Sequence, residues 1–247
     1  MKRLLLLAAA LAWIAPAQAQ AAGNTRISDF TEAKHILYSR IWKDHRETLY
    51  CGFRYDGRKK VDLPAGFHTN VHRSRAHQVE AEHIVPVEHF GPAFPEWRHG
   101  DPLCVDNRGR RYNGRKCTEE RNEAFRLMEC DLHNLAPADG AVNAWRGHAQ
   151  FAELGRSGEA IFGPTCPMAF DRRREHVEPP ARSKGLIART YLYMDETYPE
   201  FRMSDQQRQL MEAWDRQYSP TPWECERNRR ITRVQGNANR FVDRVCR

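Results

Sequence analysis

The chain has 247 residues, 40% of them hydrophobic and 29% charged, and its formal net charge is +7. This composition excludes a membrane-spanning protein, because no segment is apolar over the length that a span requires. The length suits one large domain or two small ones, and we expect one. The basic residues gather at residues 108–116, 172–174 and 227–233. Such clusters suit a polyanionic partner, although a solvated basic surface would also account for them.

The first nineteen residues are predicted to be a secretory signal peptide. They contain in order a basic start, an apolar run and a small-residue triplet: Met1-Lys2-Arg3, residues 4–14 and Ala17-Gln18-Ala19. This order is typical of a segment that is cleaved on export, and a buried N-terminal helix is the alternative. We expect residues 1–19 to be removed, residues 20–247 to form one soluble domain, and the protein to be periplasmic or secreted.

Seven cysteines are spread along the chain and form no CxxC pair, which argues against a structural zinc site. In an exported protein we expect disulfides instead. Cys104–Cys117 and Cys225–Cys246 are the expected pairs, since each closes a short loop, although the sequence does not fix the connectivity. The odd number of cysteines leaves one thiol unpaired.

The first expected element is a helix over residues 30–45. Apolar residues recur there at helical spacing: Phe30, Ala33, Leu37 and Ile41. Residues 50–55, followed by Asp56-Gly57, predict a short β-hairpin. Residues 79–85 carry three apolar side chains and His83 at alternate positions, which predicts a strand that ends before Pro86.

The rest of the chain is predicted to be mainly helical. Residues 90–116 are rich in Gly, Pro, Asn and Arg and are expected to lack regular structure. Helices are expected over residues 118–128, around Asn143 and through most of the C-terminal third. The capping signals in that third are N-caps at Ser204 and Thr221 and a helix stop at Gly236. We therefore expect an α+β fold that is mainly helical with a small antiparallel sheet.

Glu82 and His83 are the first candidates for chemistry, within the segment EAEHIVPVEHFG at residues 80–91. Glu82 offers a hard oxygen ligand suited to Mg²⁺, and His83 can take a proton from water near neutral pH. A strand-end pair making ordinary hydrogen bonds is the structural alternative. Neighbours on a regular strand point to opposite faces, so a shared site requires the backbone to bend between them. Glu88-His89 repeats the dipeptide without the spacing of a zinc-protease signature.

The segment DLHNLAPADGAVNAWRG at residues 131–147 offers a second ligand. The amide oxygen of Asn143 is a neutral hard donor, which beside Glu82 would leave most of a cation's shell to water and substrate. A helix cap or a surface amide is the alternative role for Asn143. His133 and Asn134 precede this helix, and there we expect them to bind loop backbone.

These segments and two later ones closely resemble the bacterial endonuclease I family of periplasmic and secreted nucleases. The resemblance covers nearly all of the mature chain and rests on four motifs in order: EAEHIVPVEHFG, DLHNLAPADGAVN, EPPARSKGLIARTYLYM and TPWECERNRRITRVQGNAN. It implies a ββα-metal finger within the α+β fold. In such a unit a strand pair presents the general base and the following helix presents a metal ligand.

Carried over by position, the resemblance implies that His83 is the general base. It further implies that Glu82 and Asn143 bind a divalent cation, which would be Mg²⁺, Mn²⁺ or Ca²⁺. Arg115 is implied to contact the scissile phosphate. Arg115 has competitors in the same loop: Arg108, Arg110 and Arg111.

The resemblance also bears on the cysteines. Phe53 and Ala65 stand where family members often carry cysteines, which implies that one disulfide is absent from this chain. Cys130 stands where the family pattern has no cysteine, so it is the candidate for the unpaired thiol.

The expected activity is hydrolysis of DNA and RNA by a monomer that recognises the phosphate backbone and tolerates many sequences. A nucleic-acid-binding protein of the same fold that has lost catalysis is the alternative hypothesis. A phosphatase or a protease is a third hypothesis, with little support from the motifs.

Overall fold

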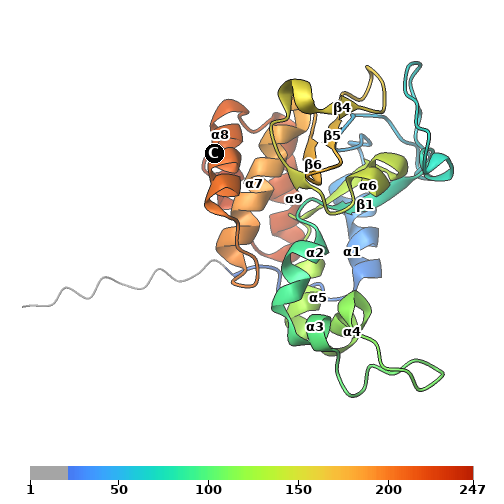
Figure 1. The fold of residues 1–247 in the computed structure, drawn as a ribbon. Coiled ribbons are helices and arrows are strands. Elements are labelled where there is room, and N and C mark those ends of the chain that lie inside the picture. Colours follow the sequence, from blue (N-terminus) through green and yellow to red (C-terminus); the bar gives the residue numbers. More distant parts are fainter. Residues whose placement is uncertain (1–21, 247) are drawn as a thin grey trace, which may run out of the picture.

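The computed structural model describes residues 22–246, so the expected signal peptide over residues 1–19 lies outside the described residues. Figure 1 shows the C-terminal helices on one side of the molecule, and helix α6 with the strands on the other. The chain is mainly helical and contains two small sheets, which confirms the predicted α+β class. Among the residues described, no helix is long and apolar enough to cross a membrane.

The N-terminal helix begins at the predicted position. Helix α1 spans Phe30–Ile36 and continues as a π-helical turn, η1, over Leu37–Ile41. Its start is defined by Asp29, whose carboxylate accepts a hydrogen bond from the Glu32 amide at 2.7 Å. The predicted helix is therefore confirmed except at residues 42–45, which lie beyond its end.

The hairpin predicted from residues 50–55 and the turn Asp56-Gly57 is confirmed only in part. The chain turns back there and forms one antiparallel bridge, between Tyr55 and Val61, but this segment contains no strand. Its backbone is held by distant parts of the chain. The Leu49 amide donates to the Pro137 carbonyl at 2.7 Å, and Cys51 forms a disulfide with Cys166. These long-range contacts override the local β propensity of the segment.

A ββα unit lies at the centre of the fold. Strand β1, Val79–His83, pairs antiparallel with β2, Leu135–Asp139, and helix α6, Gly140–Arg146, follows β2 without a loop. Asp139 ends the strand and caps the helix, since its carboxylate accepts hydrogen bonds from two amides of the first helical turn. The unit therefore brings together two segments that are far apart in the sequence.

Strand β1 ends two residues earlier than predicted. The Ile84 amide donates to the Asn134 carbonyl, and the side-chain amide of Asn134 bonds both the N–H and the C=O of Val85. Asn134 therefore continues the backbone contacts where the sheet stops. This confirms the structural role expected for Asn134.

The segment between β1 and β2 is more helical than predicted. It contains, in chain order, α2, Val87–Phe90; η3, Gly91–Ala93; α3, Pro95–His99; α4, Gly114–Arg121; and α5, Glu123–Glu129. The expectation of a loop throughout residues 90–116 is therefore wrong. The helix predicted over residues 118–128 is divided at Asn122, whose extended backbone ends α4 and whose side chain caps α5.

A second sheet follows α6, where the sequence predicted no strands. Its strands lie side by side in the order β3, Gln150–Phe151; β6, His176–Glu178; β5, Ala169–Asp171; and β4, Glu159–Ala160. Each strand has two or three residues. Such strands are too short to show the alternation from which strands are predicted.

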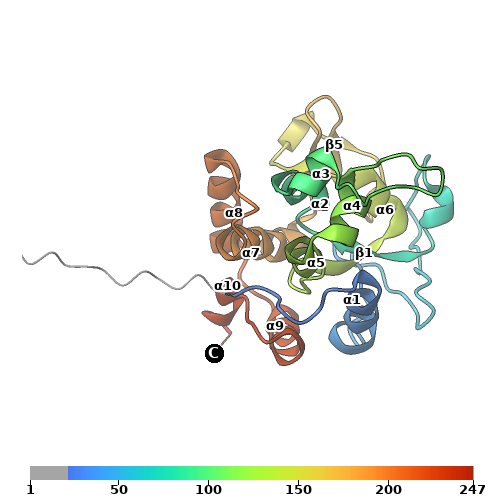
Figure 2. The same cartoon turned by 90° about the horizontal axis from the view of Figure 1, so that it is seen from below.

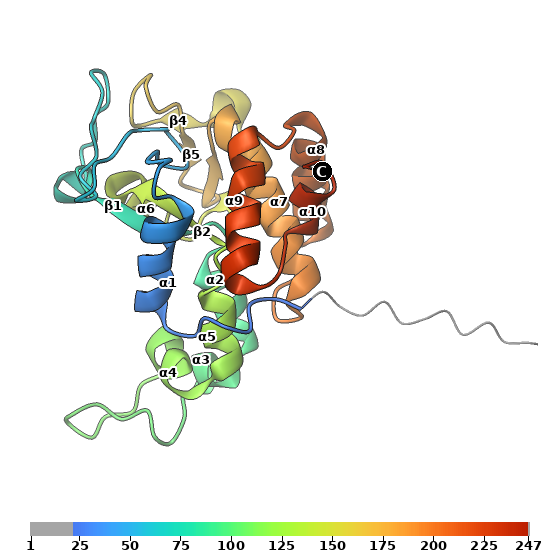
Figure 3. The same ribbon diagram turned by 180° about the vertical axis from the view of Figure 1, so that it is seen from behind.

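The C-terminal third is helical as predicted (Figure 3). It comprises α7, Ala181–Thr197; α8, Asp205–Gln217; α9, Pro222–Gln235; and α10, Arg240–Asp243. The predicted caps are confirmed: Ser204 and Thr221 accept hydrogen bonds at the starts of α8 and α9, and Gly236 ends α9 with a φ of 97°. Helix α9 lies beside η1 (Figure 2), where Arg230 donates to the Ile41 carbonyl at 2.9 Å.

Three disulfides join parts of the described chain. The predicted pairs Cys104–Cys117 and Cys225–Cys246 are both present, and Cys51–Cys166 is the third. Cys130 is the free cysteine and is buried, which confirms it as the unpaired thiol.

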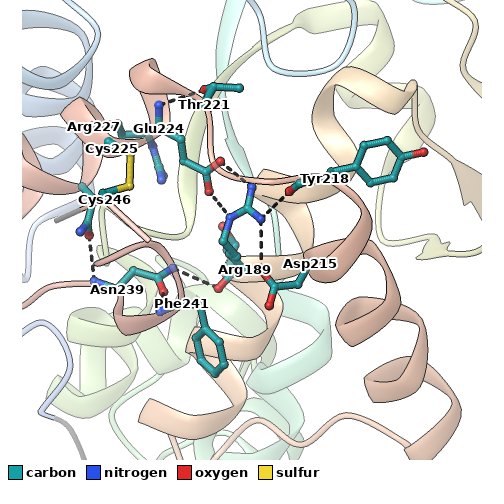
Figure 4. Close-up of polar contacts among 12 residues, drawn as sticks. Arg189, Asp215, Tyr218, Thr221, Glu224, Cys225, Arg227, Asn239, Phe241 and Cys246 are labelled. Carbon is teal, nitrogen blue, oxygen red and sulfur yellow. Dashed lines mark hydrogen bonds and ion pairs between the residues drawn. A yellow bond between two sulfur atoms is a disulfide. The ribbon is translucent and has the colours of Figure 1, made fainter. Parts of the chain in front are cut away.

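A buried arginine ties three C-terminal helices together (Figure 4). Arg189 of α7 donates to both carboxylate oxygens of Glu224 in α9 at 2.6 Å, and to Asp215 in α8 at 3.1 Å. It also donates to the Tyr218 carbonyl at 2.7 Å. Because the arginine and both carboxylates are buried, the loss of Arg189 would leave uncompensated charge in the core.

Candidate active site

The four side chains singled out in the sequence line one cavity of about 150 Å³. Glu82 and His83 border it from the end of β1, and Asn143 borders it from α6. Arg115 borders it from the first turn of α4. Residues from three separate elements thus share one polar site.

Glu82 is a buried carboxylate with two partners. The Tyr50 hydroxyl donates to its Oε1 at 2.5 Å, and Arg146 donates to the same oxygen at 3.0 Å. Burial raises the pKa of Glu82, and the Arg146 charge and the Tyr50 hydrogen bond oppose that rise. Arg146 is itself buried and also bonds the His83 and Ile84 carbonyls. Tyr50 and Arg146 therefore hold the carboxylate in place, although no sequence pattern singled out either of them.

Asn143 is oriented by Glu80. Its amide nitrogen donates to Glu80 Oε2 at 2.8 Å, which directs the amide oxygen away from that carboxylate. Glu80 in turn accepts a hydrogen bond from Arg75 Nε at 2.8 Å. Glu80 and Glu82 are two residues apart on β1, so both face α6. The spacing of these two acidic residues was the sequence signal that could have identified Glu80.

His83 is buried, and its contacts define its tautomer. Its Nε2 lies 2.9 Å from the Glu129 carbonyl oxygen. A carbonyl oxygen only accepts, so Nε2 carries the hydrogen and Nδ1 keeps a lone pair. The ring stacks on Phe30 with 5.0 Å between centroids. Burial, with the nearby charge of Arg115, lowers the pKa of His83 to about 3, so the ring is neutral at neutral pH.

The bend expected between Glu82 and His83 is absent. Both residues stay paired with β2 in one continuous register. Their side chains leave opposite faces of the strand, since Glu82 meets Arg146 whereas His83 stacks on Phe30. The prediction of a bend is wrong because the cavity lies at the end of β1, where it is bordered by side chains from both faces.

Arg115 is held in place by two carboxylates. It donates to Glu119 at 2.8 Å and to the buried Glu129 at 2.7 Å. Its guanidinium carbon lies 5.3 Å from the centroid of the Phe30 ring. Its competitors in the same loop do not line the cavity: Arg108, Arg110 and Arg111.

The site offers oxygen donors for a cation. In the described part of the chain, no group of three or more His, Cys, Asp or Glu side chains is placed to hold a metal ion. The Glu82 carboxylate and the Asn143 amide, both hard oxygen ligands, border the cavity together. This donor set fits a divalent cation that keeps several of its waters, as Mg²⁺ does.

The other histidines singled out in the sequence have structural contacts. The His89 ring bonds the His148 carbonyl at 2.8 Å and does not line the cavity, although Glu88 does. His133 bonds the Asn237 carbonyl at 3.0 Å and is fully buried. The structural role expected for His133 is therefore confirmed.

The ββα unit carries a polar cavity within an α+β fold. The chain belongs to the endonuclease I family, since the family model described as Endonuclease I matches residues 51–246. An extracellular deoxyribonuclease from Aeromonas hydrophila is 40% identical over 88% of this chain and 90% of its own length. A periplasmic deoxyribonuclease from the same organism is 37% identical over 94% of this chain and 90% of its own length.

A third similar protein is Endonuclease-1 of Buchnera aphidicola subsp. Acyrthosiphon pisum, 35% identical over 89% of this chain and 82% of its own length. These similarities confirm the family resemblance that the motifs indicated. They also confirm the predicted location, which is periplasmic or secreted.

Proposed function

We propose that this protein is a metal-dependent endonuclease that hydrolyses phosphodiester bonds in DNA and RNA with little dependence on sequence. The observation that carries the proposal is the joint placement of a neutral histidine, a carboxylate, an amide oxygen and an arginine at one cavity. Phosphodiester hydrolysis needs an activated water, positive charge near the phosphate and a group that holds the phosphate. The cavity offers residues for each of these requirements.

His83 is the proposed general base. Because its Nε2–H is donated to the Glu129 carbonyl, Nδ1 is the atom that accepts a proton from water. The hydroxide so formed attacks phosphorus, the bond to the leaving oxygen breaks, and that oxygen is protonated from solvent. The Glu129 carbonyl stabilises the imidazolium through the same hydrogen bond. Arg115 binds an oxygen of the phosphate under attack.

Glu82 and Asn143 are the proposed ligands of a divalent cation, which is Mg²⁺, Mn²⁺ or Ca²⁺. Tyr50 and Arg146 both bind Oε1 of Glu82, so Oε2 is the oxygen that Glu82 presents. When bound, the cation neutralises charge on the phosphate and the leaving oxygen. The chain's own part is to hold two oxygen ligands beside the base.

DNA is the proposed substrate because the similar proteins are named deoxyribonucleases. RNA is included because contacts to phosphate carry no information about the base. The proposal treats residues 1–19 as a cleaved signal peptide. Residues 20–247 then form one monomeric nuclease domain.

Plasmid cutting by the mature protein tests the proposal. Mg²⁺ should allow the protein to nick plasmid DNA, and EDTA should stop the reaction. His83→Ala should lower the rate by roughly 10²–10⁴-fold while the protein stays folded and still binds DNA. His89→Ala is the matched control, because His89 belongs to the second Glu-His dipeptide and lies outside the cavity. Full activity of His83→Ala would contradict the assignment of the base.

The alternative is a nucleic-acid-binding protein of the same fold that does not cut. The presence of all four side chains at the cavity favours the enzyme. The same assay separates the two, because a binding protein retains DNA with every divalent ion and cuts with none. Parallel RNA and single-stranded DNA substrates define the range of the activity.

A further inference from the structure

A second cavity adjoins the candidate active site. It has a volume of about 230 Å³ and shares Arg146 and Gly147 with the active-site cavity. Trp145 of α6 and Phe170 of β5 both border it. The shared Arg146 and Gly147 place this cavity next to the active-site cavity, which Asn143 borders.

The second cavity combines aromatic rings with a positive charge. The ring centroids of Trp145 and Phe170 lie 5.5 Å apart. The guanidinium carbon of Arg172 lies 4.2 Å from the centroid of the Trp145 ring. Arg172 is exposed and, within residues 22–246, makes no ion pair, whereas its neighbour Arg174 contacts Asp171. Its charge is therefore available to an anion.

We propose that this cavity binds the nucleobase next to the scissile phosphate, with Trp145 as the stacking surface and Arg172 as a contact to the phosphate of that nucleotide. This inference rests on the proposed nuclease function. A flat base can take the position over Trp145 that the flat guanidinium occupies, because both are attracted by the face of the indole ring. The displaced guanidinium then pairs with the phosphate.

The physical properties of the cavity favour a nucleobase over other ligands. Its volume suits one planar ring system, and most of the surface that its walls expose is apolar, although Asp171 and Glu175 also border it. Stacking on an aromatic ring tolerates every base, which agrees with an enzyme that has no sequence preference. In a duplex both faces of a base are already stacked, so the contact requires a base that has left the stack. The cavity should therefore increase the affinity for single-stranded stretches more than the affinity for intact duplex.

Oligonucleotide binding tests the inference separately from catalysis. The mature protein carrying His83→Ala is titrated in Mg²⁺ with a labelled single-stranded oligonucleotide and with an abasic oligonucleotide of the same length. We expect Trp145→Leu to weaken binding of the base-bearing strand by roughly 5- to 100-fold and to leave binding of the abasic strand unchanged. Trp145→Phe should restore most of the affinity, because it keeps an aromatic face.

The charge contact has its own control. Arg172→Gln should weaken binding of both strands and reduce the dependence of affinity on salt, as expected for a lost phosphate contact. Arg216→Gln removes the same charge from α8, and α7 lies between α8 and α6 (Figure 1). This control should change neither the affinity for the two strands nor its dependence on salt.

Two results would overturn the inference. One is equal affinity of the His83→Ala protein for the two strands, a comparison that needs no change at Trp145. The other is an equal loss of affinity for both strands in Trp145→Leu. Failure of the wild-type protein to cut DNA would refute the proposed function instead, and the plasmid assay detects that failure independently.

Discussion

The Nε2 atom of His83 donates a hydrogen bond to the Glu129 carbonyl at 2.9 Å. The carboxylate of the same glutamate binds Arg115 at 2.7 Å. One residue at the end of α5 thus positions both the proposed base and the proposed phosphate ligand. Phe30 of α1 contacts both of them as well, through ring stacking and a cation–π contact. The site therefore depends on the packing of α1, α4 and α5 around the end of β1.

Tyr50 should influence cation binding through Glu82. Tyr50→Phe removes the hydroxyl that donates to Glu82 at 2.5 Å, so the carboxylate loses part of its orientation. We expect the Mg²⁺ concentration for half-maximal cutting to rise by roughly 10-fold or more. A Mg²⁺ titration of plasmid cutting measures this change.

Tyr55→Phe provides the matched control for that experiment. Tyr55 is also buried, but its hydroxyl has no hydrogen-bond partner in the described part of the chain. Its removal should leave the Mg²⁺ requirement unchanged. An identical requirement in Tyr50→Phe would show that Tyr50 does not support the metal ligand.

Arg115 should contribute to the chemical step through its paired donors. Arg115→Ala is expected to lower kcat/KM by roughly 100-fold or more, because a donor to the developing charge is lost. Arg115→Lys keeps the charge without the planar fork and should recover only part of the activity. Arg110→Ala is the control, since Arg110 pairs with Asp106 on an exposed loop. Equal effects of Arg115→Ala and Arg110→Ala would reject the assignment.

Arg189 should determine much of the stability of the C-terminal helices. Arg189→Met leaves the buried carboxylate of Glu224 without its ion-pair partner, whereas Asp215 keeps Arg244, and we expect a cost of about 3–5 kcal/mol in the free energy of unfolding. Arg216→Met on the surface should change it by less than about 1 kcal/mol. Urea unfolding of the two variants measures both values. A loss below about 1 kcal/mol in Arg189→Met would contradict the role of this cluster.

His133 should make the protein less stable in acid. Burial lowers the pKa of His133 from 6.5 to about 4, so between these values the unfolded chain binds more protons than the folded one. Stability contributed by the neutral ring is complete above pH 6.5 and is lost as the pH falls toward 4. The free energy of unfolding should therefore fall by about 3 kcal/mol over this pH range.

His133→Gln isolates this contribution. The glutamine retains a donor for the Asn237 carbonyl but does not titrate. Urea unfolding measures how much the free energy of unfolding falls between pH 7 and pH 4. This fall should be smaller in the variant than in the wild-type protein by about 3 kcal/mol. The same loss in both proteins would mean that other groups cause the acid sensitivity.

Local signals predicted the boundaries of several elements. Thr221 and Gly236 delimit α9 through contacts within four residues of the cap. The disulfides Cys104–Cys117 and Cys225–Cys246 close sequence separations of 13 and 21 residues. Cysteines that lie this close together in the sequence could be proposed as pairs from their spacing alone. Cys51–Cys166 closes a separation of 115 residues and left none.

The sequence by itself determined which chemistry is available, because the motifs contain His83, Glu82 and Asn143 and because the family was recognisable from them. Only the tertiary structure decided that these residues border one cavity without a bend in β1, and that Tyr50 and Arg146 hold the carboxylate. The reason is physical. Helix caps and short loops depend on neighbouring residues, whereas contacts between distant side chains depend on how the whole chain packs.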